Sequence, residues 1–125
     1  MIDPNRPVRV FRNWKHGCYS IMQGGALRAS ARQVRLADVE CRVREQGRER
    51  MLREARRNVH AFAVGRLVDF VHPDEERALE VVDGRGVFYD PWRFAAFVDR
   101  ETESPVARAG VAQFDEEGVV YAEAA

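Results

Sequence analysis

The expected fold depends most on residues 43–62, which read VREQGRERMLREARRNVHAF. Apolar or small residues recur there at the spacing of one helical face, at Val43, Gly47, Met51, Leu52 and Ala55. Ion pairs four residues apart, such as Glu49 with Arg53, add about 0.2–0.5 kcal/mol each to an isolated helix, so tertiary packing must hold it. We therefore expect a helix over residues 45–57, followed directly by a strand.

Strand patterns precede this expected helix. Alternating apolar residues indicate a β-hairpin formed by Val8–Phe11 and Cys18–Met22, and Gly24-Gly25 indicates a further turn. Between residues 34 and 43 the alternation shifts by one residue. This shift predicts a β-bulge or a bend near Ala37-Asp38.

Strand patterns also follow the expected helix. They predict a strand at Val59–Phe70, a hairpin of Val81–Val82 with Val87–Tyr89, and two closing strands, Val106–Phe114 and Val119–Tyr121. The sum is an α+β fold, in which a curved, mostly antiparallel β-sheet packs on one main α-helix. The whole chain, residues 1–125, is expected to form a single domain.

Composition and charge narrow the class of protein. The chain is 46% hydrophobic and 32% charged, as in an ordinary soluble domain. It has no apolar run of the roughly 18 residues that a membrane span needs and no signal-like start, so a cytoplasmic location is expected. Residues 1–60 carry a net charge of about +8 and residues 61–125 about −8. Such complementarity suits folding, a ligand cleft or self-association, and we expect a dimer or higher homo-oligomer.

The junction after the expected helix contains the first candidate binding site, formed by Arg56, Arg57, Asn58 and His60. An arginine fork matches phosphate geometry, an amide both donates and accepts, and a histidine can stack or hydrogen-bond. Together these groups suit a nucleotide-like ligand. The alternative is that the arginines are solvated residues of the last helical turn and that Asn58 is its C-cap.

A second candidate site lies in the turn from residue 88 to residue 93, where the sequence is FYDPWR: Phe88, Tyr89, Asp90, Pro91, Trp92 and Arg93. Aromatic faces can stack on a base, Arg93 can meet a phosphate, and Asp90 can accept hydrogen bonds from ribose hydroxyls. The alternative is a rigid Asp-Pro turn with aromatic residues in the core.

The sequence does not indicate catalysis or a metal centre. His16 and Cys18 lack the orienting partner of a nucleophile, and the three histidines have no metal-ligand spacing. We expect no cofactor, no metal and no catalytic residue. A small nucleotide hydrolase built from His60 with Asp90 or Glu54 is the enzymatic alternative.

The segments REARRNVHAFAVG (53–65), VFYDPWRFAAFVD (87–99) and VRVFRNWKHGCYSIMQGG (8–25) resemble a family of small phage and prophage proteins. The chain is also similar to the phage anti-Thoeris proteins, oligomeric sponges that sequester cyclic ADP-ribose isomers without degrading them. This resemblance implies a binding protein in the cytoplasm of an infected bacterium. It also implies a ligand pocket, with candidates at Arg56, Arg57, Asn58, Tyr89, Trp92, Arg93 and Arg108.

One position departs from that resemblance. An amide is expected before the proline of the aromatic turn, so Asp90 puts a phosphate contact there in doubt and leaves a ribose contact. Two other functions stay open: a small phage effector that inhibits a host protein through the arginine-rich face from Arg28 to Arg57, and a nucleic-acid-binding module. The zero net charge argues against the latter.

Overall fold

The computed structural model describes residues 1–13, 15–43, 61–82, 87–88, 106–107, 110–116 and 119–123. Its strands are β1 (Val8–Asn13), β2 (Cys18–Gln23), β3 (Ala26–Ala31), β4 (Gln33–Val43), β5 (Ala61–Val71), β6 (Val87–Phe88), β7 (Val106–Ala107), β8 (Gly110–Phe114) and β9 (Val119–Glu123). Within these ranges no helix occurs, and hence none long and apolar enough to cross a membrane.

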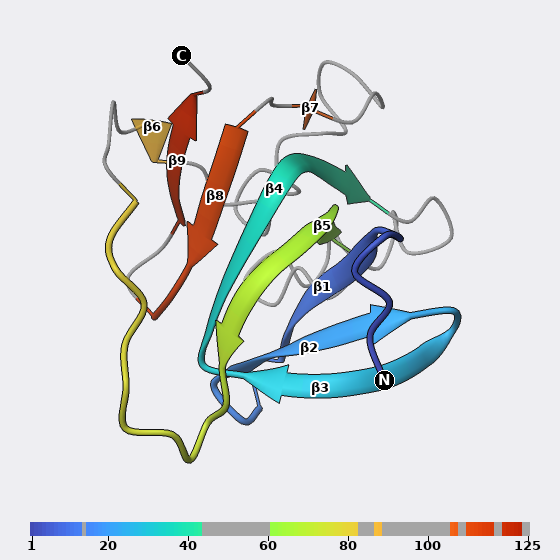
Figure 1. The fold of residues 1–125 in the computed structure, drawn as a ribbon, viewed down its shortest axis with the longest axis vertical. Coiled ribbons are helices and arrows are strands. Elements are labelled where there is room, and N and C mark those ends of the chain that lie inside the picture. Colours follow the sequence, from blue (N-terminus) through green and yellow to red (C-terminus); the bar gives the residue numbers. More distant parts are fainter. Residues whose placement is uncertain are drawn as a thin grey trace.

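The described strands form one antiparallel sheet in the order β3-β2-β1-β5-β4-β8-β9-β6, with β7 also paired to β4. The sheet is strongly coiled. In Figure 1, β2 and β3 run across the direction of β4 and β8, and the chain turns sharply where β3 leads into β4. One part of the sheet therefore packs against another part of the same sheet.

The core lies between these two parts of the sheet. Its fully buried side chains come from β1 and β2 on one side and from β4 and β8 on the other, including Val8, Ile21, Val34, Leu36 and Phe114. The Tyr19 and Phe114 rings meet edge to face, with their centroids 6.1 Å apart. Burial of apolar surface is the main force that drives such packing.

The expected α+β class is wrong, because the described residues form an all-β fold. The expectation followed from the helical spacing of apolar residues between residues 45 and 57. Within the described residues the coiled sheet covers its own core, and every described residue in the main buried cluster comes from a strand. The helix expected over residues 45–57 lies outside the described residues.

The predicted irregularity in β4 is confirmed. The pairing of β4 with β5 shifts between Ala37 and Glu40, and Asp38 has a positive φ of 54°. Figure 1 shows the bend that follows in β4. Before the bulge β4 pairs with β8, and after it β4 pairs with β7. A local shift in sequence pattern thus marks the place where the central strand changes neighbours.

The other strand predictions have mixed outcomes. The first hairpin is confirmed by the pairing of β1 with β2. Of the two predicted closing strands, the second corresponds to β9, whereas the first corresponds to β7 and β8. The hairpin predicted for Val81–Val82 with Val87–Tyr89 is wrong, because β6 pairs with β9 instead. Short apolar runs predict strands, but they carry little information about which strand is the neighbour.

The hydroxyl of Tyr19 joins the two parts of the coiled sheet. Tyr19 on β2 donates a hydrogen bond of 2.6 Å to the carbonyl oxygen of Asp115, just after β8. We expect Tyr19→Phe to lower the free energy of unfolding by about 1 kcal/mol, because one hydrogen bond is lost while the ring stays in place. Urea unfolding at constant m-value measures this loss. An unchanged midpoint would show that water replaces the hydroxyl at no cost.

Candidate functional site

The face of β1 that points away from the core carries a cation and an aromatic ring. Val8 and Val10 are fully buried, so the alternation of a strand places Arg9 and Phe11 on the opposite, outer face. The register pairs Arg9 with Met22 and Phe11 with Ser20 of β2. A basic, an apolar and an aromatic side chain therefore lie close together on the outer face of the first hairpin.

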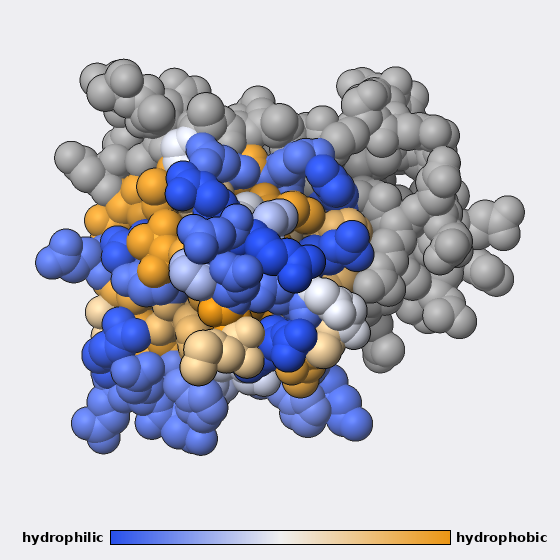
Figure 2. Space-filling model, turned by 45° about the vertical axis from the view of Figure 1, so that its right-hand side comes forward, coloured by the Kyte–Doolittle hydropathy of each residue, from blue (hydrophilic) through white to orange (hydrophobic). Residues whose placement is uncertain are grey.

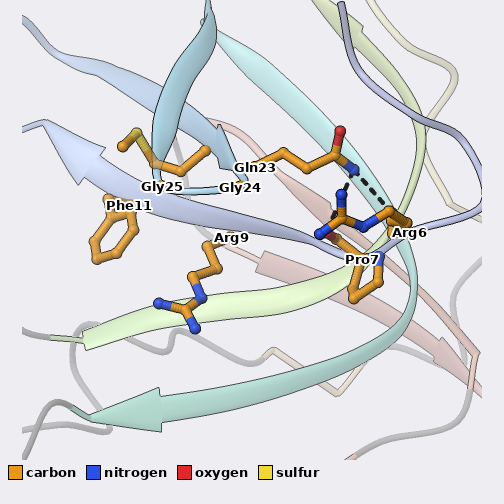
Figure 3. Close-up of a pocket in the computed structure, with 8 residues that line it drawn as sticks. Arg6, Pro7, Arg9, Phe11, Gln23, Gly24 and Gly25 are labelled. Atoms are coloured by element: carbon orange, nitrogen blue, oxygen red, sulfur yellow. Dashed lines mark hydrogen bonds between the residues drawn. The ribbon is translucent and has the colours of Figure 1, made fainter.

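These side chains line a pocket of about 520 Å³, a size that suits a small-molecule ligand. Its lining residues are Arg6, Pro7, Arg9, Phe11, Met22, Gln23, Gly24 and Gly25. Figure 3 shows Arg9 and Phe11 projecting from the same side of β1, and Gln23 reaching toward Arg6 and Pro7. Among the described residues, the lining contains two guanidinium groups and no carboxylate.

The β2–β3 turn forms one wall of this pocket. Gly24 and Gly25 both have positive φ, 62° and 77°, which is the pattern of a type I′ hairpin turn. A Cβ atom on Gly25 would meet nothing within 4 Å. The backbone conformation, rather than lack of space, therefore requires glycine at that position.

A bulge in β3 brings two more side chains to the rim. Ile21 pairs with Ala29 and Met22 pairs with Leu27, so Arg28 is an extra residue. Leu27 consequently shares the outer face with Met22, and it is 58% exposed. The Nε of Arg28 donates a 3.1 Å hydrogen bond to the Gln23 carbonyl oxygen. A third guanidinium group thus lies beside the pocket.

The buried side chain of Gln23 ties the N-terminal segment to the pocket. Its Oε1 accepts a 2.7 Å hydrogen bond from the Asp3 amide. Its Nε2 donates to the carbonyl oxygens of Asp3 and Arg6, at 3.0 and 3.2 Å, with that of Pro7 at 3.5 Å. Gln23 is only 6% exposed, so this amide group satisfies several backbone groups away from water.

Aromatic rings support the Arg9 side of the pocket. The Phe11 and Phe62 rings stack with centroids 5.1 Å apart, and the Arg9 guanidinium lies 5.4 Å from the Phe62 centroid. A cation over an aromatic face is attracted by the ring quadrupole. Phe62 is buried and Phe11 half-buried, so Phe11 is the ring that a ligand could reach.

An acidic group two strands away from Arg9, Glu40, is already paired. The register places Val64 of β5 between Arg9 and Glu40 of β4. Arg42 donates hydrogen bonds of 2.8 and 3.1 Å to the Glu40 carboxylate, and these bonds lower the pKa of Glu40 below its usual value. Glu40 is therefore charged at neutral pH, with Arg42 as its counter-ion.

The arginines near the pocket differ from several other described arginines in their partners. In the described ranges, Arg35, Arg66 and Arg77 each form an ion pair, with Asp69, Asp38 and Glu75. The same part of the chain gives no carboxylate partner to Arg6, Arg9 or Arg28. Figure 2 shows hydrophilic and hydrophobic residues intermixed on one face of the molecule. Positive charge that has no carboxylate partner within the described ranges makes the pocket attractive to an anion.

The site predicted from the sequence is almost entirely outside the described residues. This holds for Arg56, Arg57, Asn58, His60, Tyr89, Asp90, Trp92, Arg93 and Arg108. Phe88 is described only as part of β6, where it pairs with Val120 of β9. The roles of these residues therefore stay predictions.

Sequence reasoning missed Arg6, Arg9 and Gln23. The alternation around Val8 and the Gly24-Gly25 turn were the available signals. The pairing of Arg9 with Met22 and the burial of Gln23 were needed to join those signals into a pocket. No group of three metal-ligating side chains occurs within the described residues.

In the described residues, the fold and pocket define an all-β arrangement with a single coiled sheet and an arginine-lined cavity on its outer face. The family model for the Mycobacterium phage L5 gene 82 protein matches residues 1–122, and the chain belongs to that family. This confirms the resemblance to small phage proteins, whereas similarity to nucleotide-sequestering proteins is not shown. No curated protein and no solved structure matches the chain.

Proposed function

We propose that this phage protein binds and sequesters a small phosphate-bearing, nucleotide-like molecule. The observation that carries the proposal is the pocket with Arg6 and Arg9 in its lining and no carboxylate. Guanidinium groups recognise phosphate through charge-assisted hydrogen bonds, which are roughly twice as strong as neutral ones. The half-buried ring of Phe11 supplies an apolar surface on which a base can stack.

The side chains that line the pocket favour sequestration of the ligand without turnover. Among the eight residues that line the pocket there is no histidine, carboxylate, cysteine or hydroxyl side chain. Acid–base and nucleophilic catalysis need such groups within hydrogen-bond reach of the reacting atom. The protein would then act stoichiometrically, as a non-enzymatic binder without a cofactor.

The more specific proposal is that the ligand is a cyclic nucleotide immune signal, such as a cyclic ADP-ribose isomer. The protein would act in the cytoplasm of the infected bacterium, as a dimer or higher homo-oligomer. Arg57, Asn58 and Trp92 stay in the proposal as predicted further contacts. This step rests on the resemblance drawn from the sequence and on the pocket's suitability for phosphate.

Thermal unfolding with a ligand panel tests the proposal. The panel contains cyclic ADP-ribose isomers, cyclic di- and trinucleotides, NAD, ADP-ribose and inorganic pyrophosphate. A ligand at 100 times its dissociation constant stabilises the folded state by about 2.7 kcal/mol. We expect a clear upward shift with at least one phosphate-bearing species, recovered chemically unchanged after denaturation. A panel without any shift would contradict the proposal and favour a host protein as the partner.

We expect Arg9→Ala to weaken binding of the active ligand about tenfold or more. A hydrogen bond from a charged donor contributes about 1.5–3 kcal/mol, and 1.4 kcal/mol corresponds to a factor of ten. Arg9 is exposed on β1, so the fold should be retained. Isothermal titration calorimetry measures the change.

The matched control is Arg66→Ala. It removes the same side chain from β5, but Arg66 is exposed and paired with Asp38 at 2.9 Å. Such surface pairs contribute about 0–1 kcal/mol to stability. An equal loss of binding in Arg9→Ala and Arg66→Ala would show that general positive charge, rather than this pocket, attracts the ligand.

A further inference from the structure

The segment that carries Arg6 has no regular secondary structure. Residues 1–7 precede β1, and they are anchored where Ile2 packs on the core and where Val8 begins the strand. Between these anchors the segment makes local bonds, from Asn5 N to Asp3 Oδ1 at 2.9 Å and from Arg6 N to Asp3 O at 3.3 Å. Such local turns do not attach the segment to the sheet.

Gln23 supplies that attachment. Its side-chain amide bonds the Asp3 amide and the carbonyl oxygens of Asp3 and Arg6, as Figure 3 shows in part. The backbone of Gln23 is engaged as well, because its carbonyl oxygen accepts the bond from Arg28. One residue therefore contacts both arginine-bearing segments that flank the Gly24-Gly25 wall.

We propose that Gln23 is the positioning residue of the pocket, which holds Arg6 where its guanidinium meets the anionic part of the ligand. This inference rests on the proposed function, and it assigns to Gln23 a part in setting the affinity for the ligand. An arginine on a free segment must be ordered when the ligand binds, whereas a segment that is already held avoids that cost. Holding the Arg6 carbonyl oxygen fixes the backbone from which the side chain extends.

The chemistry of an amide explains the residue type. The segment presents one donor, the Asp3 amide, and acceptors at the carbonyl oxygens of Asp3 and Arg6. Glutamine offers an acceptor and two donors on one planar group. Glutamate would keep the bond from Asp3 but lose the donors, and leucine would leave every partner without its bond.

The experiment compares Gln23→Leu with Arg6→Ala and with the double variant. Two readouts are used: hydrogen exchange at the Asp3 amide, which needs no ligand, and calorimetric binding of inorganic pyrophosphate. We expect Gln23→Leu to speed Asp3 exchange and to weaken pyrophosphate binding about tenfold, as Arg6→Ala does. The double variant should bind no more weakly than either single variant, because both changes remove the same contact.

Gln113→Leu is the matched control. Gln113 is 3% exposed on β8, and its Oε1 has no hydrogen-bond partner. It is the other buried glutamine in the described ranges, and it does not line the pocket. This variant should change neither Asp3 exchange nor pyrophosphate binding.

The outcomes separate this inference from the function on which it rests. Unchanged Asp3 exchange in Gln23→Leu would overturn it, and so would unchanged binding or losses that add fully in the double variant. If the wild-type protein binds no pyrophosphate and no member of the nucleotide panel, the proposed function fails, and with it the role of Arg6. The exchange result would then still decide whether Gln23 holds the segment.

Discussion

Replacing Phe114 by alanine is expected to lower the free energy of unfolding by about 3–5 kcal/mol. Phe114 is fully buried, and it has the largest side chain among the fully buried described residues. It pairs with Val34 of β4 and meets the edge of the Tyr19 ring of β2, so it joins both parts of the coiled sheet. Its removal leaves a cavity that strands held by hydrogen bonds on both sides cannot close.

Urea unfolding measures this effect, with protein concentration held constant because self-association would change the midpoint. Val81→Ala is the control, since Val81 is 76% exposed and should change stability by less than about 0.5 kcal/mol. A Phe114→Ala loss below about 1 kcal/mol would mean that the two parts of the sheet do not share one core.

A methyl group added at Gly65 should also destabilise the protein, by about 1–3 kcal/mol, through overpacking. A Cβ atom there would lie 2.7 Å from the carbonyl oxygen of Ala37 and 3.2 Å from Cβ of Leu36. Both atoms belong to β4, which is paired with β5 on one side and β8 on the other. The bulged strand cannot yield to the methyl group without losing pairing.

Val68→Thr on the same strand is the control for Gly65→Ala. Val68 is 49% exposed, so a residue of similar size should be tolerated there within about 0.5 kcal/mol. Equal midpoints for Gly65→Ala and the wild-type protein would show that β4 and β5 can accommodate the methyl group. The 2.7 Å separation between that Cβ and the Ala37 carbonyl oxygen would then be too short.

The bulge illustrates how far a local pattern reaches. A change in alternation near Ala37-Asp38 was sufficient to predict an irregular strand, because side chains on a strand must alternate between two faces. The same pattern carried no information about Gly65, which lies far away in the sequence. Their contact depends on the pairing of β4 with β5.

The expected α+β fold class is wrong for a different reason. The expected helix follows from the periodicity of residues 45–57. Such periodicity shows that an element is amphipathic, but it does not show which surface the element covers. The apolar residues of the first hairpin and of β8 cover each other instead. Sheet coiling arises from twist accumulated over many strands, so it cannot be read from one segment.

The candidate site also depends partly on local sequence pattern and partly on contacts between distant residues. Arg9 and Phe11 could be placed on one face of a strand from the alternation of Val8 and Val10. Their pocket also needs Met22, which comes from the strand register, and Arg6, which comes from the bonds to Gln23. A glutamine in a strand pattern gives no sign of being buried, since glutamines are mostly exposed.

The amino-acid pattern alone was sufficient for the first hairpin, the Gly24-Gly25 turn, the last strand and the bulge in β4, because each depends on neighbours within a short stretch of chain. Among the described residues, three features required the folded chain: the neighbour of β6, the core between two parts of one sheet, and the pocket that contains Arg6 and Arg9. Each of these depends on residues distant in sequence, which meet only after the sheet has coiled and its register has been set.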